Sequence, residues 1–93
     1  MRCWFLKGPI PGDWLHRAAI LPGRALHVAL ALWYLAGLEK RQNVRITARV
    51  LDRFGVSRYA GRRGLAALEY AGLVNVKRHK GRCPIVTLLG GRA

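Results

Sequence analysis

The chain has 93 residues, which suffices for one small domain but not for two domains with separate hydrophobic cores. Hydrophobic residues make up 52% of the sequence, a share that excludes disorder throughout the chain. The formal net charge of +13 favours a polyanionic partner, nucleic acid first and an anionic membrane surface second.

The first 21 residues predict an N-terminal extension to the main domain. Cys3–Leu6 is expected to form a short strand, and Gly8–Gly12, which contains two prolines, predicts a rigid turn. Asp13 is then expected to cap a short helix over residues 14–21. We expect this extension to pack on the core or on a dimer partner.

The dimer hypothesis starts from three tryptophans, Trp4, Trp14 and Trp33. Together they offer more aromatic surface than a domain of this size usually buries. They could contribute to a homodimer contact through the extension and the helix over residues 22–40. Burial of all three inside one chain is an equally good interpretation.

Residues 25–38, ALHVALALWYLAGL, are apolar on nearly every side of a helix. Fourteen residues are fewer than the roughly 20 that span a bilayer, and Pro22, Arg24 and His27 interrupt any extension upstream. The segment therefore predicts a buried helix over residues 22–40, with Pro22 near its first turn and no membrane span.

Ile46–Leu73 predicts two helices joined by a tight turn. Thr47 can cap the first helix, Gly55 can end it in the left-handed conformation, and Ser57 can cap a second helix over 57–71. Apolar and small residues at helical spacing give both helices an inner side. These residues are Val50, Leu51, Phe54, Ala60, Gly61, Gly64, Leu65, Leu68, Ala71 and Leu73.

The outer side of the second helix carries a basic cluster. Helical spacing places Arg58 and Arg62 in one row and Tyr59 and Arg63 in the next. Residues 1–43 hold six Lys and Arg against two acids, net +4, whereas residues 44–93 hold eleven against two, net +9. The alternative is that these are ordinary solvated arginines in a chain with 13 Arg and 4 Lys.

A three-stranded β-sheet is expected around this helix pair. Residues 74–79 alternate in polarity, Pro84–Leu89 is a second β-rich run, and Lys80–Cys83 is a basic hairpin tip between them. Asn43–Ile46 is expected to add the third strand.

With this hairpin the sequence resembles a known family. The segment Arg45–Leu89 is similar to the small bacterial winged helix-turn-helix regulators, and VSRYAGRRGLAALEYAGLVNVKRHKGRCPIVTLL resembles the compact regulators of bacterial mobile elements. The join LxxLExAGLVxVxR, at Leu65–Arg78, occurs in many winged-helix families. The resemblance covers about half of the chain.

The resemblance implies an α+β fold, with a winged helix-turn-helix DNA-binding domain over residues 22–93. Its function would be transcriptional control through double-stranded DNA, in the cytoplasm on the nucleoid. The recognition helix 57–71 would enter the major groove, and the wing 74–89 would lie on the flanking backbone or minor groove.

Two sets of DNA contacts follow. Arginine suits base reading because its planar fork can bridge guanine O6 and N7, and it also binds phosphate. The expected base-reading residues are Ser57, Arg58, Tyr59, Arg62 and Arg63. The expected backbone contacts are Arg45, Arg49, Arg53, Lys77, Arg78, His79, Lys80 and Arg82.

The sequence offers little for other chemistry. The four acids lie on four different predicted elements, and no nucleophile or phosphate-loop motif is present, so we expect neither an enzyme nor a cofactor. Cys3 and Cys83 lack metal-site spacing; a disulfide between them is a minor alternative. Residues 1–11 lack the long apolar run and cleavage site of a signal peptide.

The sequence is also consistent with three other functions. An architectural or recombination-directionality factor would use the same groove contacts to bend DNA. A winged helix can also serve as a protein-interaction module, with weak and sequence-insensitive DNA affinity. A membrane-surface protein would need an exposed apolar helix.

Overall fold

The computed structural model describes residues 10–41, 43–78, 81 and 83–89, and all structural statements below concern these residues. The strand expected at Cys3–Leu6 and the first part of the expected turn, residues 8 and 9, lie outside them, as do His79, Lys80 and Arg82.

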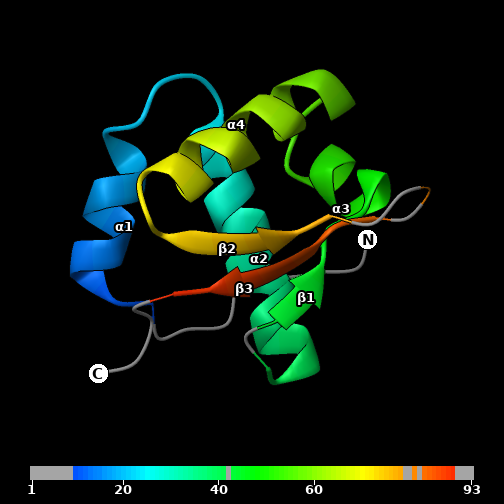
Figure 1. Ribbon diagram of the computed structural model, residues 1–93, viewed down its shortest axis with the longest axis horizontal. Coiled ribbons are helices and arrows are strands. Elements are labelled where there is room, and N and C mark those ends of the chain that lie inside the picture. The colour runs from blue at the N-terminus through cyan, green and yellow to red at the C-terminus, as the bar shows by residue number, and fades with distance from the viewer. Residues whose placement is uncertain (1–9, 42, 79–80, 82, 90–93) are drawn as a thin grey trace, which may run out of the picture.

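The described part of the chain is a small α+β domain of four helices and one three-stranded antiparallel sheet (Figure 1). In chain order the elements are α1 (Gly12–Ala19), α2 (Ala25–Glu39), β1 (Asn43–Arg45), α3 (Ala48–Arg53), α4 (Arg58–Tyr70), β2 (Val74–Lys77) and β3 (Ile85–Leu88). The strand order is β1-β3-β2, so the last strand lies between the other two. This arrangement is compatible with a winged helix.

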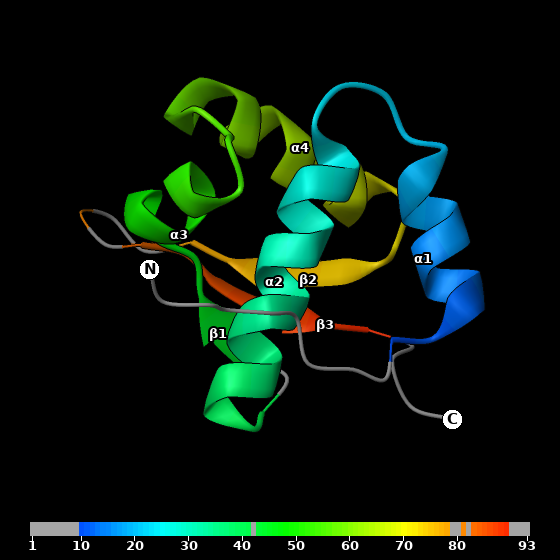
Figure 2. The ribbon, with the colours of Figure 1, turned by 180° about the vertical axis from the view of Figure 1, so that it is seen from behind.

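The sheet has one inner face and one outer face. Val86 in the central strand lies opposite Val44 of β1 and Val76 of β2, and all three side chains are buried. Their neighbours Asn75 and Lys77 are exposed, so burial alternates along the strand as a half-buried sheet requires. Figures 1 and 2 show α2 behind the sheet and in front of it, respectively, and therefore covering the inner face.

Helix α2 is the central element, and it packs against α4, α1, β1 and α3. Eight of its residues are buried, which agrees with the expected all-round apolar helix. Its predicted start was wrong: the helix begins at Ala25, and Pro22 lies in the bend before it. The helix ends at Glu39, and Lys40 then takes the left-handed conformation at φ 58°, the position where glycine is commonest.

Helix α1 packs against α2 through its aromatic side chain. Trp14 lies edge-on to Trp33 with ring centroids 5.4 Å apart, and its Nε1 donates to the Leu73 carbonyl oxygen at 3.1 Å. The two tryptophans are only 3% and 6% exposed, so they are core residues of this chain.

The predicted start of α1 was also wrong. The helix begins at Gly12, its N-cap is Pro11 in an extended conformation, and it has no side-chain cap. Asp13 lies inside the first turn, where a carboxylate still interacts favourably with the helix dipole.

The predicted caps of α3 and α4 are confirmed. Thr47 Oγ1 accepts from the Val50 amide at 3.3 Å, and Ser57 Oγ accepts from the Ala60 amide at 3.1 Å. Between the helices Gly55 has φ +72°, and the buried Val56 anchors the turn in the core. Local sequence signals therefore fix the relative placement of α3 and α4.

Candidate nucleic-acid interface

Helix α4 is buried on one side and exposed on the other. Leu65 and Leu68 are 5% and 0% exposed and pack into the core, whereas Tyr59 is 66% exposed and Arg63 is also exposed. In Figure 1 the helix lies along the outside of the molecule, above the sheet. Its outer side is therefore available to a partner along its whole length.

Tyr59 and Arg63 form a pair on this outer side. Arg63 Nη1 donates to the Tyr59 hydroxyl at 3.2 Å, and the guanidinium carbon lies 5.6 Å from the Tyr59 ring centroid. The hydrogen bond and the cation–π contact hold the arginine against the helix surface. A guanidinium held in this way loses less conformational entropy when it binds.

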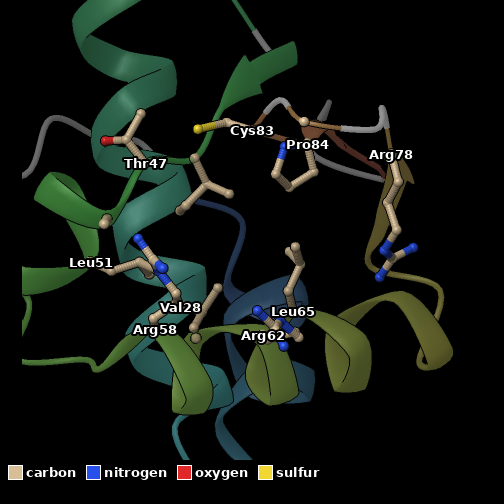
Figure 3. A pocket seen from close by; sticks show the side chains of 13 residues that line it. Val28, Thr47, Leu51, Arg58, Arg62, Leu65, Arg78, Cys83 and Pro84 are labelled. Carbon is tan, nitrogen blue, oxygen red and sulfur yellow. The ribbon is translucent and has the colours of Figure 1, made fainter.

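Arg58 and Arg62 lie on a different flank of α4, which faces the hairpin. Both line an open groove of about 800 Å³ between α4, the start of α3 and the β2–β3 connection (Figure 3). Thus the structure separates the four long side chains of the basic cluster into an outward pair and a groove-lining pair.

Ser57 serves mainly as the N-cap of α4. Its oxygen already accepts the Ala60 amide, although the hydroxyl proton remains available for donation. Its predicted base contact must therefore use the hydroxyl as a donor or the second lone pair.

Arg78 is held by an acid that sequence reasoning did not connect with it. Its Nη1 lies 3.1 Å from Glu69 Oε1, and this ion pair ties the end of β2 to the last turns of α4. The side chains are 55% and 38% exposed, so the pair adds little to stability. It does neutralise the one acid of α4, and only the tertiary fold brings the two groups together.

Two other predicted backbone contacts are engaged inside the chain. Arg45 Nη1 donates to the Cys83 carbonyl oxygen at 3.3 Å and so braces β1 against the hairpin connection. The Arg53 guanidinium lies 6.0 Å from the Tyr34 ring centroid and therefore faces α2. Arg49 and Lys77 are exposed on α3 and β2, respectively.

The described ranges contain no group of three or more His, Cys, Asp or Glu side chains that could hold a metal ion. Over the same ranges no helix is both long and apolar enough to cross a bilayer. Comparison with protein-family models, with curated proteins and with solved structures found no match to this chain.

Proposed function

We propose that this chain is a sequence-specific double-stranded DNA-binding protein of the winged helix-turn-helix type and that it regulates transcription. The observation that carries the proposal is the exposed side of α4, where Tyr59 and Arg63 project outward beside Arg58 and Arg62. Glu69, the one acid of α4, is already paired with Arg78.

The shape of this surface suits duplex DNA. The major groove, about 12 Å wide, admits one α-helix. The side of α4 that faces away from the sheet is not covered by another helix or strand (Figure 1). Arg63, supported by Tyr59, presents the planar fork that pairs with guanine O6 and N7. Arg58 and Arg62, which the sequence predicts at base edges, lie on the flank facing the hairpin, so in this proposal they would contact the DNA backbone that borders the groove instead.

The hairpin would then provide sequence-independent contacts. Lys77 is exposed at the end of β2, and it would contact a phosphate beside the groove that α4 occupies. Phosphate contacts by His79, Lys80 and Arg82, which lie outside the described residues, stay predictions.

A homodimer through residues 1–21 and 22–40 also stays a prediction. Because Trp14 and Trp33 are buried within the chain, two of the three tryptophans are unavailable for a dimer contact. A dimer would need other side chains, such as the exposed Leu38 at the end of α2. Its DNA half-sites would lie about 34 Å or a multiple of that distance apart.

The test begins with selection of bound fragments from random duplex DNA at near-physiological salt. Fluorescence anisotropy then compares the enriched duplex with a scrambled one for the native chain, Arg63→Ala and Lys77→Ala. Arg63→Ala should cost about 1–3 kcal/mol on the enriched duplex and little on the scrambled one, because it removes a base contact. Lys77→Ala should weaken both duplexes alike.

Both variants alter exposed side chains, so both should fold like the native chain. Circular dichroism verifies this. Equal losses on the enriched and scrambled duplexes for Arg63→Ala would refute base reading by α4. Failure of the native chain to enrich any sequence would refute the proposed function itself.

A further inference from the structure

The groove between α4 and the hairpin has a floor and a rim of different character. The floor is formed by core side chains from α2, α3, α4 and the residue that follows β1, which are at most 8% exposed. They are Val28, Ile46, Leu51 and Leu65. Figure 3 shows Pro84 and Cys83 of the hairpin connection closing the groove on the side opposite α4.

The rim is cationic. Arg58 and Arg62 rise from α4, and Arg78 lies at the hairpin end of the groove (Figure 3). Within the described part of the chain, the side chains of Arg58 and Arg62 make no hydrogen bond or ion pair, and no acid lines the groove. Two unneutralised guanidinium groups next to an apolar floor favour an anion that also carries an apolar body.

A DNA strand accounts for only part of this arrangement. Its phosphates can satisfy Arg58 and Arg62 from outside, but a charged backbone gains nothing from the apolar floor beneath them. The volume of about 800 Å³ lies in the range of small-molecule sites, about 300–1,000 Å³.

We propose that this groove binds a small amphipathic organic anion, with the acidic group on Arg58 and Arg62 and an aromatic or aliphatic body on the floor. The bound anion occupies two arginines that the proposed DNA interface uses, so it lowers DNA affinity. The binding site stands independently of DNA binding, whereas this regulatory consequence rests on the proposed function.

The probe is 8-anilino-1-naphthalenesulfonate, whose fluorescence rises in apolar sites, compared with N-phenyl-1-naphthylamine, which has the same body without the sulfonate. Titration of the native chain should show one site per chain that prefers the sulfonate. Arg58→Gln/Arg62→Gln should weaken sulfonate binding by at least about tenfold, because it removes two charge-assisted contacts.

The matched control is Arg49→Gln/Arg63→Gln, which lowers the net charge by the same two units at exposed positions outside the groove. Its affinity for the sulfonate should stay within about twofold of the native value, since surface charge outside the site is screened by salt. Equal losses in the two double variants, or equal binding of the neutral probe, would overturn the proposal.

Cys83 reports where the probe sits, because its exposed thiol lines the groove. In a Cys3→Ser background, the sulfonate should slow alkylation of Cys83 by iodoacetamide, and Arg58→Gln/Arg62→Gln should abolish the protection. Alkylation at an unchanged rate with saturating probe would place the probe elsewhere and overturn the proposal.

The last measurement separates this proposal from the proposed function. With the enriched duplex, the sulfonate should raise the apparent Kd for DNA over the concentration range in which it protects Cys83. Groove binding without any DNA affinity would refute DNA binding and its regulation but keep the anion site. DNA binding without groove binding would refute the anion site alone.

Discussion

Gly64 lies where α4 crosses α2, and this crossing sets how the exposed side of α4 is presented. A Cβ atom at this position would lie 2.9 Å from Val28 Cγ2 and 3.2 Å from both the Ala25 Cα and the Arg24 carbonyl oxygen. Two of these three neighbours are backbone atoms, which cannot move without shifting the helix. Glycine at this position therefore permits the close approach of α2 and α4.

We predict that Gly64→Ala destabilises the fold. The expected loss is about 1–3 kcal/mol from overpacking, partly offset by about 1 kcal/mol of better helix propensity. Chemical denaturation followed by circular dichroism measures the change.

Gly61→Ala is the matched control on the same helix. Its Cβ would meet Leu51 Cδ1 at 2.6 Å, but that atom is the far end of a flexible side chain and can rotate away. The Gly61 variant should therefore lose less stability than the Gly64 variant. The reverse order would show that α2 and α4 do not pack as described.

Ser57 defines where α4 begins, and its side-chain cap stabilises the whole helix. We predict that Ser57→Ala lowers the free energy of unfolding by about 1 kcal/mol, because the Ala60 amide loses its cap. Ser57→Asp keeps an acceptor at the cap and should retain most of that stability. Equal stability of the two variants in thermal denaturation would contradict a stabilising role of this cap.

At the scale of elements, the sequence predicted α3, the turn and α4 well because their signals are local. Thr47, Gly55 and Ser57 each fix the backbone within one helical turn. The strands β1, β2 and β3 were also predicted within one or two residues. In β2 the alternation of apolar and polar residues made this possible, and in β3 the run of β-branched residues did.

Two helix starts were predicted wrongly for a common reason. Proline can occupy the first turn of a helix or the segment that leads into it, and sequence alone does not separate these positions. Pro22 lies in the bend before α2, and Pro11 caps α1.

The division of the basic cluster could not be predicted from the sequence. Helical spacing placed Arg58 and Arg62 in one row, but only the position of the hairpin shows that this row borders a groove. The Arg78–Glu69 pair likewise joins a strand to a helix, and no local spacing rule relates the two residues. Such features depend on tertiary packing.

At the scale of the whole molecule, the net charge of +13 should dominate DNA affinity. We predict that log K falls linearly with log[salt], with a slope of about −0.9 for each phosphate contacted. Lys77→Ala should make this slope shallower by about one unit because it removes one phosphate contact. Anisotropy titrations at several salt concentrations measure the slope.

Glu39→Gln is the control for that measurement, because it changes the net charge by one unit at the C-terminal end of α2, outside the predicted DNA contacts. Its slope should equal that of the native chain. A slope that follows total charge rather than the position of the substitution would indicate diffuse attraction and no defined interface.

The measurement that most directly tests the DNA-binding surface is a backbone amide NMR titration of the native chain with the enriched duplex. We predict that the largest chemical-shift changes fall on residues 57–63 of α4 and on Lys77 and Gly81 of the hairpin. Trp14 in α1 and Leu35 near the end of α2 should barely change. Changes centred on α1 and the end of α2, with α4 unperturbed, would contradict recognition of DNA by the outer side of α4.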